Sequence, residues 1–236
     1  MNDRQSTSTL IIATRNAHKV GEIRAILGND FRYLTLKDFP DAPSVIENAD
    51  TFAGNATKKA LELAHWLKQA GGDDVATRNP EPGTWNIFVL ADDSGLEVDA
   101  LDGKPGVHSA RFAALDSAIS GNSTDADNNA KLLRLLENVP QEKRAARFRC
   151  VIALAVFNPS SFVLCPEVFE GWCEGRIGPT PRGNGGFGYD PLFIPEGFEL
   201  SFAELGEDVK NRLSHRAKAL QKLHQYFRET GIEGIK

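Results

Sequence analysis

Cysteine is scarce in this sequence of 236 residues, which contains only Cys150, Cys165 and Cys173. Their number is odd, and no two of them have the CxxC spacing of a zinc or redox site. This pattern argues against a disulfide framework and against a cysteine-based metal site. We therefore expect buried structural thiols and a reducing compartment.

Long apolar segments are also lacking. The longest apolar run, residues 150–157, suits a buried strand and is much too short to cross a bilayer. Residues 1–8 are polar, lack the apolar core of a secretion signal, and predict a flexible tail. The sequence therefore predicts a cytoplasmic protein without a membrane partner.

An excess of basic residues is the third absence, because the formal net charge is −5. Nucleic acid polymers usually bind to a broad basic face, so we expect no such partner. A small anionic ligand needs only a local basic pocket, which leaves phosphate chemistry open.

The composition that remains, 41% hydrophobic and 25% charged residues, is typical of a globular protein. The length suits one large α/β domain or two small lobes that share a core. Hydrophobic patterning predicts strands at residues 9–13, 31–36, 87–91, 145–157 and 162–173, and helices at residues 20–27, 51–69, 125–138 and 214–229. Strands and helices alternate early and a hairpin follows around residues 158–161, which predicts a mixed sheet with helices on its faces.

An acidic group, Asp92-Asp93-Ser94-Gly95, directly follows the predicted strand at residues 87–91. Ligands of open α/β sheets bind beyond the carboxyl ends of strands, so this group is a candidate site. Neighbouring side chains of an extended chain point in opposite directions, so only one carboxylate would face a ligand. An ordinary polar turn is the alternative interpretation.

Glu47 is a second acidic candidate, in the loop before the long helix. Magnesium prefers oxygen ligands, and one or two carboxylates together with substrate phosphates can hold it. A single glutamate in a loop is more commonly solvated, so Glu47 alone indicates little.

Candidate phosphate-binding groups occupy residues 14–19, between the first strand and the first helix. Free backbone N–H groups at a helix start favour anions, and Lys19 adds positive charge. The glycines and the Gly-Lys-Ser/Thr end of a Walker loop are absent. Lys58 and Lys59 lie in the next predicted helix, where one could turn inward, although exposed lysines are commoner there.

Residues 183–188 fit the GxGxxG pattern, but no strand precedes them and no helix follows, so a dinucleotide fingerprint is excluded. The glycines favour close approach of a flat ligand, with Phe187 or Tyr189 available for stacking, and an ordinary loop is the alternative. His215 and Arg216, near Lys210 and Ser214, could donate to a purine edge or form a basic surface turn.

Together these segments resemble the inosine triphosphate pyrophosphatase family, also called the Ham1 family. The resemblance covers roughly residues 9–228, and the runs ADDSGLEVDAL and GGFGYDP are its most specific parts. It also includes the segments ATRNAHK at 13–19, TFAGNATKKA at 51–60, ADDSGLEVDALDGKPGVHSARF at 91–112, PRGNGGFGYDPLF at 181–193 and SHR at 214–216.

The resemblance implies an α/β fold with a long central mixed β-sheet, flanking helices, and two lobes with the active-site cleft between them. It also implies that residues 1–236 form a single catalytic domain, usually in a homodimer. The implied activity is Mg²⁺-dependent hydrolysis of ITP, dITP and XTP to the monophosphate and pyrophosphate, which removes these purine nucleotides from the nucleotide pool.

The resemblance also implies roles for individual residues. Asp93 matches the proton acceptor and a metal ligand, Glu47 matches a second metal carboxylate, and Lys59 would neutralise charge during catalysis. The implied substrate-binding groups are Thr14, Arg15, Asn16, Ala17, His18, Lys19, Asn55, Ser94, Phe187, Gly188, Tyr189, Asp190, Lys210, His215 and Arg216.

Three positions depart from the family pattern. Gly54 stands where many members carry glutamate, and Arg15 stands where a small residue is common. The loop at residues 71–86 is longer than in compact members. If the missing glutamate assists metal binding, the remaining carboxylates must hold the metal without it.

Overall fold

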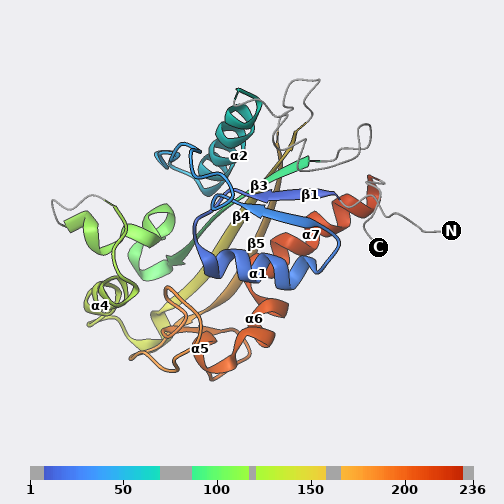
Figure 1. Ribbon diagram of the computed structural model, residues 1–236. Helices are drawn as coiled ribbons and strands as arrows, with labels where there is room; N and C mark the ends of the chain where they lie inside the picture. The colour runs from blue at the N-terminus through green and yellow to red at the C-terminus, as the bar shows by residue number, and fades with distance from the viewer. Residues whose placement is uncertain (1–7, 70–86, 117–120, 158–165, 231–236) are drawn as a thin grey trace. The chain divides into compact units, whose positions relative to one another are not determined.

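The computed structural model describes residues 8–69, 87–116, 121–157 and 166–230 (Figure 1). The strands in these ranges are β1 (Thr9–Ile12), β2 (Arg32–Thr35), β3 (Ile87–Val98), β4 (Ala145–Phe157), β5 (Glu167–Ile177) and β6 (Phe193–Pro195). The α-helices are α1 (Ala17–Leu27), α2 (Phe52–Gln69), α4 (Asp125–Leu135), α5 (Phe202–Leu205), α6 (Glu207–Leu213) and α7 (His215–Glu229). Among the described residues, no helix is both long and apolar enough to span a membrane.

One mixed sheet contains the six strands in the order β2-β1-β3-β4-β5-β6. β1 pairs in parallel with both of its neighbours, with Leu10 opposite Tyr33 of β2 and opposite Phe88 of β3. β5 and β6 pair antiparallel, with Arg176 opposite Ile194. The predicted mixed α/β sheet is therefore confirmed, and parallel β1–β3 pairing brings the ends of β1 and β3 to one edge.

The chain divides into two compact units. The first contains Met1–Asp93, Val151–Phe169 and Ala219–Lys236, and the second contains Ser94–Cys150 and Glu170–Lys218. The boundary in β3 falls between Asp93 and Ser94. The cleft that the family resemblance implies between two lobes stays a prediction.

The first unit has a core of aliphatic side chains from β1, β3, α1 and α2, closed by aromatic rings. Phe227 of α7 is central to it, with ring centroids 5.2 Å from Phe31 and 5.1 Å from Phe88. On α2 the buried residues Ala60, Leu63, Ala64 and Leu67 follow the helical period, as the sequence predicts. Truncating a fully buried ring such as Phe227 to alanine removes about 3–5 kcal/mol of stability.

The second unit has its own core, in which Phe148 of β4 packs on Phe193 of β6 at a centroid distance of 4.6 Å. Phe202 at the start of α5 stacks on Phe193 at 5.3 Å. Ser201 caps α5, and its hydroxyl and Glu204 form a capping box. This cap fixes the helix that follows the glycine-rich loop.

The structure corrects several sequence-based boundaries. The acidic group does not follow a strand, because β3 continues through Asp92 and Asp93 to Val98. Leu96 and Val98 are fully buried, so the alternating pattern continues the strand and excludes the polar-turn interpretation. The segment at 174–197, which lies outside the predicted strands and helices, contains β6 and the end of β5.

Other boundaries shift by a few residues. α1 starts at Ala17, before the predicted residue 20, because the Asn16 side chain caps it. α4 ends at Leu135, three residues before the predicted end. β5 extends to Ile177, while the predicted hairpin at 158–161, the first part of the strand predicted at 162–173, and the loop at 71–86 lie outside the described residues.

The predicted N-terminal tail is wrong at its last residue. Ser8 is buried, and its carbonyl oxygen accepts a hydrogen bond of 2.9 Å from the Arg32 N–H. Residues 1–7 lie outside the described residues. Cys150 and Cys173 are buried thiols, as expected, and Cys165 lies outside the described residues.

Candidate active site

Two buried carboxylates lie side by side in β3, within the first unit. Asp92 is 2% exposed and Asp93 is 5% exposed, and each is paired with a lysine from a different helix. Lys19 of α1 pairs with Asp92, and Lys59 of α2 pairs with Asp93 at 3.3 Å. The alternating directions of neighbouring strand residues account for this division of partners. A buried carboxylate needs such a partner, which is why β3 can continue through this acidic pair.

Lys59 joins three groups in the interior of the first unit. Its ammonium donates to the backbone carbonyl of Asp92 at 2.8 Å, to Asp93 Oδ1 at 3.3 Å and to Glu47 Oε1 at 3.2 Å. Glu47 and Asp93, the two carboxylates that the family resemblance assigns to a metal, therefore share one cation. Lys58 instead contacts Asn48, at 2.7 Å, so Lys59 is the lysine of this pair that turns inward.

Asn55 of α2 connects Asp93 to the loop that carries Glu47. Its amide nitrogen donates to Asp93 Oδ2 at 3.1 Å, and its oxygen accepts from the Ala49 N–H at 3.0 Å. Asn55 is completely buried, so these bonds are shielded from water. The loop and the Asp93 carboxylate are thus positioned by the same side chain.

Gly54 permits this close approach of loop and helix. A Cβ atom at position 54 would lie 2.8 Å from Ala49 Cβ and 3.0 Å from Thr51 Oγ1. Both distances are shorter than comfortable contacts, so a glutamate here would displace the loop. The glycine that departs from the family pattern at position 54 is therefore matched by the close approach of Ala49 and Thr51, which leaves no room for a side chain.

Burial raises the pKa of Asp93 above its ordinary value, and the positive charges of Lys59 and Lys19 offset only part of that shift. For Lys59, burial alone would lower the pKa, but the carboxylates of Asp93, Glu47 and Asp92 together raise it. Lys59 is therefore cationic at neutral pH. A carboxylate whose pKa lies above its ordinary value is better suited to accept a proton than an unperturbed one.

The oxygen ligands of this cluster suit a magnesium ion. Glu47 and Asp93 are carboxylates close enough to contact the same ammonium, and Mg²⁺ often binds through one or two carboxylates, with phosphates and water completing its shell. In the described ranges, no group of three or more His, Cys, Asp or Glu side chains forms a metal-binding cluster. The residues therefore fit an ion shared with a phosphate ligand better than a closed protein cage.

The segment at residues 14–19 leads into α1 and supplies its N-cap, Asn16, and its first residues. Asn16 Oδ1 accepts hydrogen bonds from the backbone N–H groups of His18 and Lys19, at 2.9 and 3.3 Å. Arg15 turns to the neighbouring loop, where it donates to Ser44 Oγ at 3.1 Å and to the Ala42 carbonyl at 3.3 Å. Thr14, Ala17 and His18 stay exposed or half-buried beside this cap.

In the second unit, four of the predicted base-binding groups are linked. Asp190 Oδ2 accepts from the Phe187 N–H at 2.8 Å and from Lys210 Nζ at 2.6 Å. The Lys210 ammonium lies 4.3 Å from the centre of the Phe187 ring, a cation–π contact. The Arg216 guanidinium lies 5.9 Å from the same ring.

Ser94 joins this group through Arg216, which donates to Ser94 Oγ at 3.1 Å. Arg216 is only 1% exposed, so its charge is almost completely shielded from water. A buried guanidinium beside a half-buried ring provides fixed donors next to a flat apolar surface.

Tyr189 and His215 lie deeper than a ligand-stacking role requires. The Tyr189 hydroxyl donates to the Ser109 carbonyl at 2.9 Å, and burial, followed by the nearby Asp125 carboxylate, raises its pKa. The His215 ring stacks on Phe148 with a centroid distance of 4.8 Å and an interplanar angle of 14°. Of the two rings predicted for stacking, Phe187 is the one that remains half-buried.

Sequence reasoning missed two residues that contact the glycine-rich loop at residues 183–188. Asp125 and Asn129 of α4 both hydrogen-bond to the backbone of Gly188. Their i, i+4 spacing on a predicted helix was visible, and it places both on one face. Nothing in the sequence indicated what that face would contact.

Comparisons with known proteins give the family of the chain. A family model described as "Ham1 family" matches residues 10–226, which is most of the chain. The chain belongs to the Ham1 family.

Relatives within the Ham1 family include a dITP/XTP pyrophosphatase of Geobacillus kaustophilus, 45% identical over 93% of this chain and 94% of that protein. A dITP/XTP pyrophosphatase of Geobacter sulfurreducens is 46% identical over 95% of this chain and 98% of that protein. Among solved structures, a HAM1 protein from Coxiella burnetii matches with a TM-score of 0.73 and 35% identity, over 94% of this chain and 98% of that one.

Proposed function

We propose that this chain hydrolyses dITP, XTP and ITP between the α- and β-phosphates and releases the nucleoside monophosphate and pyrophosphate. The observation that carries the proposal is the cluster in which the buried Asp93 and Lys59 meet the half-buried Glu47. The names of the relatives support the substrate class, because the proteins of Geobacillus kaustophilus and Geobacter sulfurreducens are dITP/XTP pyrophosphatases. The activity would remove non-canonical purine nucleotides from the nucleotide pool.

In this mechanism Asp93 accepts a proton from the attacking water. The oxygen atom of the water bonds to the α-phosphorus and becomes part of the monophosphate. The bond between the α-phosphorus and the bridging oxygen breaks, and that oxygen leaves with the pyrophosphate. Lys59 and Lys19 neutralise the charge that develops on the phosphates. Asn55 holds the Asp93 carboxylate in one orientation, so that one oxygen atom can face the water.

Glu47 and Asp93 would hold the magnesium ion that we propose as cofactor. When bound there, the ion would supply charge neutralisation and help to align the phosphates. Asp92 is occupied by Lys19 in the described structure, which favours a positioning role for it.

Base choice is the second part of the proposal. Lys210, His215 and Arg216 are donors, which fit the acceptor oxygen of a 6-oxo purine. Adenine presents a 6-amino donor and would leave a protein donor unpaired, and such mismatches are strongly rejected. Comparable kcat/KM values for ITP, GTP and ATP would refute this selectivity.

A pyrophosphate-release assay tests the function directly. It compares ITP, XTP and dITP with the four common triphosphates, each with and without Mg²⁺. Release from the three non-canonical substrates only with Mg²⁺ supports the proposal. Binding of the triphosphates without any release would instead favour a nucleotide-binding module that lacks catalysis. No interaction with nucleotides at all would contradict both.

A homodimer is the assembly that we propose for this chain, on the basis of the resemblance described above. Sedimentation equilibrium of the full chain tests it, because a monomer of 25.8 kDa is readily separated from a species of twice that mass. A monomeric chain with full activity would refute a dimer requirement.

A further inference from the structure

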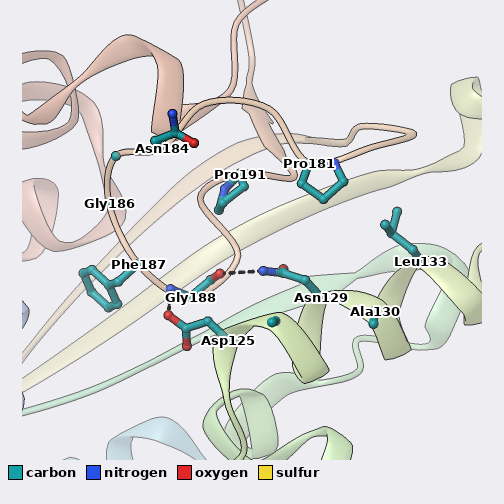
Figure 2. A pocket seen from close by; sticks show the side chains of 12 residues that line it. Asp125, Asn129, Ala130, Leu133, Pro181, Asn184, Gly186, Phe187, Gly188 and Pro191 are labelled. Carbon is teal, nitrogen blue, oxygen red and sulfur yellow. Dashed lines mark hydrogen bonds between the residues drawn. The ribbon is translucent and has the colours of Figure 1, made fainter.

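The backbone N–H and the backbone carbonyl of Gly188 are both held by one face of α4. The N–H donates to Asp125 Oδ2 at 2.6 Å, and the carbonyl accepts from Asn129 Nδ2 at 2.9 Å. Figure 2 shows Asp125 and Asn129 approaching Gly188 from the helix, with Phe187 on the adjoining part of the loop. Both side chains leave α4 on the same face, because they are four residues apart.

Close packing does not account for this connection. A cavity of about 470 Å³ lies between α4 and the loop, lined by Ala126, Ala130 and Leu133 on the helix side and by Pro181, Asn184 and Pro191 on the loop side (Figure 2). The two hydrogen bonds to Gly188 therefore contribute strongly to fixing the loop on this side. Gly188 has a φ of 63°, so its backbone conformation is itself one that other residues rarely adopt.

The residues on either side of Gly188 are those expected to contact the base. Asp190 accepts from the Phe187 N–H and from Lys210, which in turn lies over the Phe187 ring. The loop is also anchored to Ala203 of α5, whose N–H and carbonyl bond to Asp190 and Gly185 at 3.3 Å each. The α5 contacts hold the ends of this loop, whereas the α4 contacts hold its middle.

We infer that Asp125 and Asn129 are positioning residues for purine binding. They fix the Gly188 peptide and thereby set the plane of the Phe187 ring and the direction of the Asp190 carboxylate. This inference rests on the proposed function. Asp125 and Asn129 would thus raise the affinity for the base without touching the ligand. Their effect would be independent of the phosphate chemistry of Asp93 and Lys59.

The test compares Asp125→Ala with Asp127→Ala, a matched control. Asp127 lies in the same exposed helical turn, and its carboxylate contacts Thr124 rather than the loop. For Asp125→Ala we expect KM for ITP to rise about tenfold while kcat changes less than about twofold, because a charge-assisted hydrogen bond is lost only from the base side. Asp125→Asn keeps an acceptor oxygen and should recover most of the affinity.

Inhibition by inorganic pyrophosphate provides a readout that has no base. Its inhibition constant should be the same in wild type and Asp125→Ala, because the phosphate groups do not depend on Gly188. Amide hydrogen exchange should quicken in peptides covering residues 186–190 and stay unchanged in β4. Asn129→Leu, which is similar in size, should also raise KM for ITP and quicken the exchange of residues 186–190.

Several results would overturn the inference. These are an unchanged KM in Asp125→Ala, an equal KM rise in Asp127→Ala, or a pyrophosphate inhibition constant that rises in parallel with KM. An inactive wild type would instead contradict the proposed function. In that case the exchange of residues 186–190 still decides whether α4 holds the loop.

Discussion

Lys59 and Asp93 form a buried ion pair, with Nζ 3.3 Å from Oδ1, and the same ammonium also donates to the Asp92 carbonyl. The lysine is thus fixed to the strand by its backbone as well as by a side chain. Because the Asp92 carbonyl also holds the Lys59 ammonium, the ammonium stays in place even when the Asp93 side chain moves. Its position is therefore set before any phosphate arrives, which is the preorganisation that electrostatic catalysis requires.

Replacing Asp93 with asparagine should abolish most of the activity without unfolding the protein. General base catalysis typically contributes about 10²–10⁴-fold, and loss of a metal ligand adds to that, so we expect kcat to fall by at least about 10³-fold. Pyrophosphate release from ITP measures this. Lys59 keeps Glu47 and the Asp92 carbonyl as partners, so the far-UV circular dichroism spectrum should be unchanged.

Asp102→Asn is the matched control for this substitution. Asp102 is exposed and has a φ of 52°, a conformation that asparagine tolerates well. It should hydrolyse ITP at the wild-type rate. Near-normal turnover of Asp93→Asn would exclude Asp93 as the proton acceptor.

Much of the fold could be predicted from local patterns. The apolar run at β1 and the helical period of α2 are signals within a few residues, and both elements were found close to their predicted positions. β3 was cut short because carboxylates are rare inside buried strands. What keeps Asp92 and Asp93 in the strand is lysines from two helices, and such partners are invisible to a local pattern.

The site was predictable to a similar degree. The sequence left open whether Lys58 or Lys59 turns inward, because only the fold distinguishes the two lysines. The contacts of Gly188 with Asp125 and Asn129 join residues 63 and 59 positions apart in the chain. No spacing rule connects a glycine-rich loop to a particular helix face over that distance, so these contacts required the structure.

Cys173 should react slowly with thiol reagents at neutral pH. Burial raises its pKa from 9.0 to about 11, and the thiolate is the reactive form. The raised pKa in the folded state contributes stability that is present below pH 9 and is lost as the pH rises through about 11. Labelling of a Cys165→Ser variant with a disulfide reagent at pH 8 should therefore be slow until the protein is unfolded. Rapid labelling of the folded variant would contradict the burial of both remaining thiols.

Gly54→Ala should increase the magnesium requirement of the enzyme. The added Cβ would press on Ala49, whose N–H bonds to Asn55 and whose loop carries Glu47. Alanine is normally favoured over glycine inside a helix by about 1 kcal/mol, so a loss here would come from the contact and not from helix propensity. We expect the Mg²⁺ concentration for half-maximal ITP hydrolysis to rise severalfold.

The double variant Ala49→Gly with Gly54→Ala provides the control, because removing the Ala49 methyl group relieves the contact. It should return the magnesium requirement toward the wild-type value. An unchanged requirement in Gly54→Ala alone would mean that the loop adjusts without moving Glu47.

Gly186→Ala should weaken purine binding more than its backbone strain alone explains. A Cβ atom at position 186 would lie 2.2 Å from Asp190 Oδ2, the oxygen that accepts from Phe187 and Lys210. The φ of 74° adds a cost of about 1–2 kcal/mol for any residue with a side chain.

Gly197→Ala is the control that isolates the cost of the positive φ, because Gly197 has a φ of 81° with open space around its Cβ position. We expect both variants to lose stability, measured by unfolding in urea, while only Gly186→Ala raises KM for ITP by tenfold or so, about the effect of losing one charge-assisted hydrogen bond. Equal KM values in the two variants would show that the Asp190 carboxylate does not need its present position to bind the base.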